Sequence, residues 1–231
     1  MKTLLTVAVS LLFAASALAQ QNDWLIVPGK RIGPITPNTS RADLDRIFGK
    51  QNVQDQDIDD GEGGKLPATL VFPNETATSL AILWQNKRNR VAQVHICNSW
   101  YPRDPYLFPA CKWHTVDGVS LRTSLEKLEA LNGRAFQLSE WGTDAGPGSI
   151  SSWLGGRLSV YERDEKKGWL GLALEFQVSR NGLTEQQHKL YDSIQPQEGV
   201  MLSSNPAVRG LHPIVFFMVL FFPGSEQGPG R

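Results

Sequence analysis

A segment near the middle of the chain repeats an earlier segment, without a gap, at an offset of 84 residues. The two copies are residues 32–50 and 116–134. Each copy reads as an apolar residue, a polar turn, a Thr-Ser cap, a short helix and a glycine stop. The identical pairs are Thr39/Thr123, Ser40/Ser124, Leu44/Leu128 and Gly49/Gly133, and the similar pairs are Ile35/Val119, Asp45/Glu129, Ile47/Leu131 and Lys50/Arg134. We therefore expect the same local structure to occur twice.

Capping signals indicate where each repeated helix begins. In the first copy, Thr39 or Ser40 is the N-cap, and Asp43 stands three residues after Ser40, where it can complete a capping box. In the second copy, we expect the box between Thr123 and Glu126. The glycine that closes each copy can take the left-handed conformation in which many helices end.

Residues 1–19 have the pattern of a secretory signal peptide. Lys2 supplies the positive charge, an apolar run follows, and Ala17-Leu18-Ala19 is a small-x-small cleavage site. The mature chain would begin at Gln20. The apolar run is too short to cross a membrane, and we expect no membrane span in the mature chain. Because the signal is bacterial in style, we expect a periplasmic or secreted protein.

The balance of charge argues against a nucleic-acid partner. The chain has 23 Lys and Arg and 23 Asp and Glu, and loss of Lys2 with the signal leaves a net charge near −1. Such a chain lacks the positive field that collects phosphates. About 210 residues are enough to bury a real core, in one domain or in two small ones.

Apolar runs between the helices predict strands. We expect strands over residues 23–27, 68–72, 79–84, 90–96, 150–153, 157–162, 169–178 and 214–222. The last run has nine apolar residues and suits a strand that is buried on both faces. Residues 52–65 are acidic and rich in glycine, so we expect a loop there. A further helix is predicted over residues 184–194, with Thr184 and Gln187 as its capping box.

The order of these elements, a short helix followed by antiparallel strands, predicts an α+β fold. We expect two tandem units, each with a short helix packed on an antiparallel sheet. The predicted boundaries are a first unit at 20–96, a crossing loop at 97–112, a second unit at 113–222 and a flexible tail at 223–231.

The two repeated signatures, residues 33–49 and 117–133, resemble those of secreted β-lactamase-inhibitor proteins and of small outer-membrane assembly lipoproteins. The sequences of residues 29–36 and 131–136 also resemble segments of uncharacterised bacterial secreted proteins. The resemblance implies a tandem helix-plus-sheet fold, and no functional residue carries over from it. The chain departs from the assembly lipoproteins because it has two copies of the signature and no lipidated Cys.

Two histidines and two cysteines flank the crossing loop. His95, Cys97, Cys111 and His114 form a set that could hold Zn²⁺ in a tetrahedral site. A zinc-dependent secreted enzyme would use the two histidines, with Asp117 as a further candidate. The reading we favour is a disulfide between the cysteines, because an exported chain meets an oxidising compartment and these are its only two Cys. On the chain-entropy model this bridge would stabilise the fold by about 3 kcal/mol.

Acidic residues alternate in segment 52–65. If the segment binds Ca²⁺, its ligands would be Asp55, Asp57, Asp59 and Glu62. An EF-hand requires glycine at its sixth position and glutamate at its twelfth, and this segment has neither. We therefore favour a solvated acidic loop, and we expect no cofactor.

The crossing loop is rich in aromatic residues. Trp100, Tyr101, Tyr106 and Phe108 lie there with Arg103, and these residue types form the hot spots of protein interfaces. The same rings could instead pack down as a small satellite core.

The chain contains no familiar catalytic motif, such as the Gly-x-Ser-x-Gly elbow or His-Glu-x-x-His. We predict a non-catalytic, extracytoplasmic binding module whose partner is an unknown protein or cell-envelope component. A secreted enzyme inhibitor is the narrower form of this prediction. The alternatives are the zinc enzyme and a structural secreted protein with no separate activity.

Overall fold

The computed structural model describes residues 23–59, 63–85, 88–97, 110–139, 148–162, 171–178, 183–194 and 200–223. These residues contain both helices and antiparallel sheet, which confirms the α+β class. No helix among them is long and apolar enough to cross a membrane.

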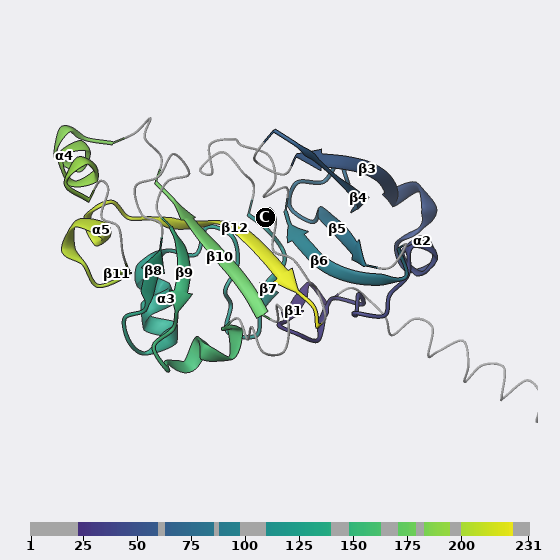
Figure 1. The fold of residues 1–231 in the computed structure, drawn as a ribbon, viewed down its shortest axis with the longest axis horizontal. Helices are drawn as coiled ribbons and strands as arrows, with labels where there is room; N and C mark the ends of the chain where they lie inside the picture. The colour runs from purple at the N-terminus through teal and green to yellow at the C-terminus, as the bar shows by residue number, and fades with distance from the viewer. Residues whose placement is uncertain are drawn as a thin grey trace, which may run out of the picture.

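Most strands belong to one nine-stranded sheet in which all neighbours are antiparallel. Across the sheet the strands are β11 (Met201–Leu202), β8 (Gln137–Ser139), β9 (Ser149–Ser152), β10 (Gly171–Gln177), β12 (Ile214–Phe221), β6 (Arg90–Ile96), β5 (Leu80–Gln85), β4 (Lys65–Val71) and β3 (Val53–Asp59). The order is close to a mirror image about the β6–β12 pair (Figure 1). We call β3 to β6 the first half-sheet and β8 to β12 the second half-sheet. The division into two tandem units stays a prediction.

A three-stranded sheet joins the starts of the two repeat copies. Its central strand is β1 (Leu25–Val27), which pairs antiparallel with β2 (Arg31–Ile32) and parallel with β7 (His114–Thr115). Ile26 of β1 is fully buried and lies opposite Ile32 on one side and Thr115 on the other. The N-terminal strand therefore ties the start of the first copy to the residues that directly precede the second copy.

The first repeated helix, α2 (Arg41–Phe48), begins as predicted. The Ser40 side chain accepts a hydrogen bond from the Asp43 N–H, and the Asp43 carboxylate accepts one from the Ser40 N–H at 2.9 Å. Gly49 ends the helix at a positive φ of 84°, but its ψ of 134° is extended rather than left-handed helical. A short 3₁₀ turn, η1 (Lys50–Asn52), follows it.

The second repeated helix, α3 (Leu125–Asn132), has a different cap from the predicted one. Ser124 is the N-cap and accepts from the Lys127 N–H at 3.2 Å. The Thr123 hydroxyl is instead the acceptor for the Ser120 N–H at 3.0 Å, in the turn before the helix. The predicted Thr123–Glu126 box is therefore wrong by one position. Gly133 takes the left-handed conformation expected of it, with φ 79° and ψ 4°.

The main core lies between the large sheet and the repeated helices. Leu44 of α2 and Leu128 of α3 are fully buried in one continuous apolar cluster. The cluster also contains Ile82 of β5, Leu174 of β10 and Met218 of β12. Figure 1 shows α2 beside β3 and β4 at one end of the sheet and α3 near β8 and β9 at the other. One core therefore includes side chains from both copies.

Other predicted elements lie close to their expected positions. The strand predicted at 90–96 has those limits in β6, and the one predicted at 214–222 is β12. The later helix is α4 (Glu185–Ile194), with the Thr184–Gln187 box in place, and α5 (Pro206–Gly210) was not predicted.

Two predictions of secondary structure are wrong. Residues 53–59 form the edge strand β3 rather than a loop, because they pair in register with β4 along their whole length. Residues 157–161 form a 3₁₀ helix, η4 (Arg157–Tyr161), rather than a strand. The Leu158 N–H donates to the buried side chain of Asn132 at 3.0 Å, and this contact holds the turn in its helical form.

Candidate functional site

The two cysteines form a disulfide across the ends of the crossing loop. The S–S distance between Cys97 and Cys111 is 2.06 Å, their Cα atoms are 6.0 Å apart, and neither cysteine is free. Cys97 follows β6, and Cys111 stands shortly before β7. The favoured pairing is therefore confirmed, and the bridge joins the end of the first half-sheet to the start of the second repeat copy.

The disulfide corrects the zinc alternative, because sulfurs bonded to each other cannot act as thiolate ligands. The two histidines also differ in their surroundings. His95 is buried on β6, whereas His114 is exposed and its Nδ1 lies 2.8 Å from the Lys112 carbonyl oxygen. Asp117 accepts a hydrogen bond from the Tyr161 hydroxyl. In the part of the chain that the structure describes, no group of three His, Cys, Asp or Glu is placed to hold a metal ion.

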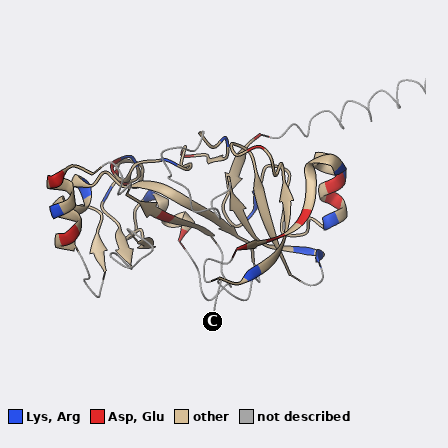
Figure 2. Cartoon of the chain, turned by 90° about the horizontal axis from the view of Figure 1, so that it is seen from above, with Lys and Arg blue, Asp and Glu red and all other residues tan. Residues whose placement is uncertain are grey.

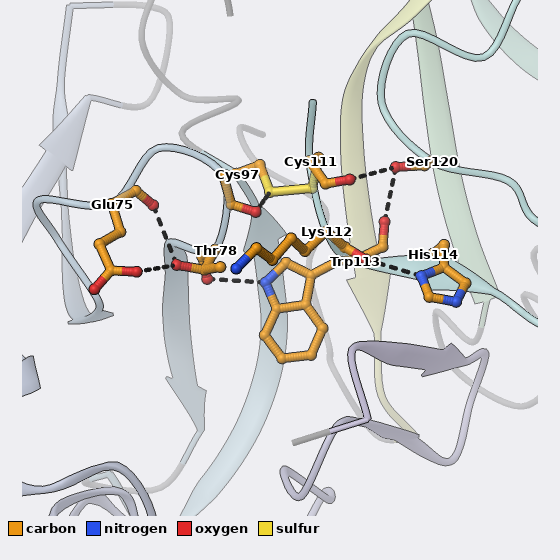
Figure 3. The surroundings of a disulfide bond; sticks show 9 residues. Glu75, Thr78, Cys97, Cys111, Lys112, Trp113, His114 and Ser120 are labelled. Atoms are coloured by element: carbon orange, nitrogen blue, oxygen red, sulfur yellow. Dashed lines mark hydrogen bonds between the residues drawn. A yellow bond between two sulfur atoms is a disulfide. The ribbon is translucent and has the colours of Figure 1, made fainter. Parts of the chain in front are cut away.

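Both ends of the crossing loop are bound to one turn, residues 77–79, between β4 and β5. The Cys97 N–H donates to the Ser79 carbonyl and the Lys112 N–H donates to the Ala77 carbonyl, each at 2.8 Å. The buried Trp113 indole donates to the Thr78 carbonyl at 2.9 Å (Figure 3). The base of the crossing loop is thus fixed by three hydrogen bonds and a covalent bridge.

Trp113 extends this base toward the N-terminal strand. Its ring meets the ring of Trp24 edge to face, with centroids 4.9 Å apart, and the Lys112 ammonium lies 5.2 Å above the Trp24 ring. The Ser120 hydroxyl donates to the Trp113 carbonyl at 2.8 Å. The base of the crossing loop is therefore packed against β1 and the second repeat copy as well as against the turn.

The predicted binding residues themselves lie outside the described residues. These are Trp100, Tyr101, Arg103, Tyr106 and Phe108, and the same holds for Glu62 of the calcium set. The structure therefore places the two ends of the predicted binding loop, and the contacts of its aromatic residues stay a prediction.

The alternating aspartates lie on β3, at the edge of the sheet, where charged residues are common. Asp55 accepts hydrogen bonds from the Thr69 hydroxyl at 2.7 Å and from Arg41 at 2.9 Å, and it forms an ion pair with Arg88 at 2.8 Å. Partial burial works to raise the pKa of Asp55, but these hydrogen bonds and the two guanidinium charges together lower it. Its oxygens therefore fasten α2 to the sheet edge rather than remaining open to a cation.

The position of His95 in the sheet was not predicted from the sequence, which offered this residue only as an alternative zinc ligand. Val94 and Ile96 point into the main core, so the alternation of a strand puts His95 on the opposite face. There it lies opposite Ala81 of β5 and Val219 of β12, and its ring meets Phe217 edge to face at 5.5 Å. Neither ring nitrogen has a hydrogen-bond partner, and burial lowers the pKa of His95 to about 4.

This face of the central strands is almost free of charge. Strands β5 and β12 contain no charged residue, and a second buried cluster of Ile58, Ala68, Leu70 and Ala81 lies on the first half-sheet. Figure 2 shows charged residues on α2 and α4 at the two ends of the molecule, with the central strands largely uncharged. The charged residues therefore lie mainly away from the central strands.

Comparisons with known protein families, with curated proteins and with solved structures gave no match for this chain. The resemblance to inhibitor proteins and assembly lipoproteins accordingly stays a prediction.

Proposed function

We propose that this chain is a non-catalytic, extracytoplasmic module that binds a protein or a cell-envelope component through the crossing loop. The observation that carries the proposal is the fixed base of the loop. Both of its ends are held to one turn by the disulfide and by backbone hydrogen bonds.

A loop that is held at its base loses less conformational entropy when it binds a partner, so more of the contact energy appears as affinity. The residues between the two anchors include three tyrosine or tryptophan side chains and an arginine. These types carry most of the binding energy in many interfaces. Fixed ends and aromatic content together favour recognition of a macromolecule.

The disulfide also supports a location outside the cytoplasm, since such bonds persist in oxidising compartments. Cleavage of the signal after Ala19 is part of the proposal. Intact-mass measurement of the exported protein, purified without reductant, should give a chain that begins at Gln20 and weighs two hydrogens less than its reduced form. A mass that includes residues 1–19 would contradict cleavage.

The narrower form of the proposal is that the partner is a secreted enzyme and that binding inhibits it. It rests on the resemblance of the repeated signatures to inhibitor proteins and on the strand order, which is nearly symmetric about β6 and β12. Because one fold hosts many functions, the choice of partner needs a direct experiment.

The experiment is capture of a partner from periplasmic and envelope extracts by the immobilised mature protein. We expect the triple variant W100A/Y101A/Y106A to lose at least about tenfold in captured partner, because hot-spot residues each contribute about 1 to 2 kcal/mol or more. The matched control is E185A/K189A, which removes an exposed ion pair on α4.

The control should capture as much partner as the native chain. Equal capture by the loop variant and the native chain would show that the crossing loop is not the binding site. Loss of capture by the control variant would show that α4 takes part in binding, which would contradict a site confined to the crossing loop. Circular dichroism of each variant checks that it is folded.

A further inference from the structure

The two half-sheets meet at a short seam. Strands β6 and β12 pair at three positions, His95 with Val219, Val94 with Leu220 and Gln93 with Phe221. One further hydrogen bond joins the Phe222 N–H to the Ala92 carbonyl at 3.0 Å. By contrast, β6 pairs with β5 at six positions and β12 pairs with β10 at seven. The seam is the shorter attachment of each of these strands.

An unpartnered histidine lies within this seam. His95 is 7% exposed, its two ring nitrogens have no hydrogen-bond partner, and its cross-strand neighbours Ala81 and Val219 are apolar and buried. The edge of its ring contacts Phe217 of the same β12 strand. A neutral imidazole tolerates such a site, but an imidazolium without a partner does not.

No charge on the surrounding strands is placed to compensate a proton on this ring. Among the described residues of β5 and β12 there is no titratable side chain. On β6 the other charged residue is Arg90, at the far end of the strand. On β10 the carboxylate of Glu175 is exposed and lies opposite Phe217, one strand beyond the seam. A protonated His95 must therefore reach water.

We propose that His95 makes the seam acid-sensitive: protonation of its ring separates β12 from β6, while the strands within each half-sheet stay paired. The seam is the shorter attachment of both β6 and β12, so these two strands separate from each other before β6 leaves β5 or β12 leaves β10. The device would let acid loosen the strand pairing between the two half-sheets while the shared core still holds them together.

The sign of the effect follows from the direction of the pKa shift. Burial holds the pKa of His95 near 4 when the seam is closed, whereas a histidine in water has a pKa near 6.5. The open form therefore binds the proton first as pH falls. The closed seam has its full stability above about pH 6.5, loses it progressively as pH falls toward 4, and loses no more below that.

Hydrogen exchange followed by mass spectrometry tests the proposal on the mature, oxidised protein. After correction for the intrinsic pH dependence of exchange, protection of the amides bonded across the seam, within residues 93–95 and 219–222, should fall at least about tenfold between pH 7 and pH 4.5, since one pKa unit is a factor of ten. Residues 53–59 and 65–71, which form the β3–β4 pair, should keep their protection.

The variant H95F assigns the effect to the imidazole. It keeps an aromatic ring beside Phe217 and removes the titrating group, so its seam protection should not change between pH 7 and pH 4.5. H114F replaces the exposed histidine and should behave as the native chain does. If H95F does not fold, the ¹³Cε1 shift of His95 in the native protein gives the same answer, because its titration should coincide with loss of protection in the seam.

Three results would overturn the proposal. The seam could keep its protection at pH 4.5, H95F could open with acid as the native chain does, or the β3–β4 pair could lose protection together with the seam. The last result would mean that acid unfolds the whole molecule.

Discussion

Asn132 in the second repeat copy makes different contacts from its counterpart in the first copy. It is 1% exposed, its amide donates to the carbonyls of Arg134 at 3.0 Å and Trp153 at 3.1 Å, and its side-chain oxygen accepts from the Leu158 N–H. The corresponding residue of the first copy is Phe48, which makes an aromatic contact with Phe72 instead. The second copy thus has a buried amide that binds three backbone groups at the position where the first copy has an aromatic ring in a ring–ring contact.

We expect N132A to lower the free energy of unfolding by about 3 kcal/mol, because it leaves buried backbone groups without partners. G156A should cost about 2 kcal/mol, since an added Cβ would lie 2.1 Å from the Asn132 side-chain oxygen. In the double variant this clash is gone, so the two losses should not add. Urea unfolding of the three variants measures this coupling, and strictly additive losses would contradict it.

Asp55 gives a second prediction at this scale, for low pH. Because its pKa is lowered in the folded state, its contribution to stability is present above the unfolded pKa of about 3.9 and is lost as pH falls through the lower folded value. The side chain is 39% exposed, so screening limits the contribution to about 1 kcal/mol.

The variant D55N should therefore be less stable than the native chain at pH 7, and the difference should shrink in acid. Thermal unfolding at a series of pH values measures it. D57N, two residues along the same strand, is the matched control. Equal pH profiles for D55N and the native chain would show that the contacts to Arg41 and Arg88 do not contribute.

At the scale of elements, the short strand β1 connects two other strands, β2 and β7, that are far apart in the sequence. It is three residues long and lies between β2, at the start of the first copy, and β7, which directly precedes the second copy. Trp24, just before it, packs on Trp113 at the base of the crossing loop. Much of the attachment of the N-terminal strand therefore depends on one aromatic pair.

W24A should lower the free energy of unfolding by about 2 kcal/mol, through loss of apolar burial and of the edge-to-face contact. K112A removes the ammonium above the same ring and should cost no more than about 1 kcal/mol. Chemical denaturation of both variants compares the contribution of the Trp24–Trp113 ring contact with that of the Lys112 ammonium. A larger loss in K112A than in W24A would show that the charge, rather than the ring pair, holds β1.

Elements were predictable from the sequence where one face of a segment is consistently apolar. The limits of β6 and the cap of α2 follow from local pattern alone. The failures depend on partners far along the chain. Strand β3 reads as an acidic loop until its pairing with β4 is known, and η4 reads as a strand until Asn132 is placed beside it. The disulfide was predictable from compartment and count, but the burial of His95 required the strand order.

At the scale of the whole molecule, the two half-sheets form one large sheet, and the main core contains side chains from the helices of both repeat copies. Leu44 and Leu128 lie in the same apolar cluster although they belong to different helices at different ends of the sheet. A core that is continuous across both copies favours unfolding of the two together.

We expect a single unfolding transition at pH 7 in which tryptophan fluorescence and far-ultraviolet circular dichroism change at the same denaturant concentration. Seven tryptophans, in both halves of the chain, report on the whole fold. Two separated transitions would show that each copy has a core of its own. In that case, deletion of either copy should leave the rest of the chain folded. If the core is shared, the same deletion should unfold the rest of the chain.

The base of the crossing loop has a consequence for how this chain can be altered. The Cα atoms of its two cysteines are 6.0 Å apart, and the sheet, the turn and Trp113 hold them there from outside the loop. Because these contacts come from outside the loop, we expect that residues between the cysteines can be exchanged for other sequences without moving the anchors. With that tolerance, the fold would serve as a display scaffold, on which a library of inserted peptides could be selected against chosen targets.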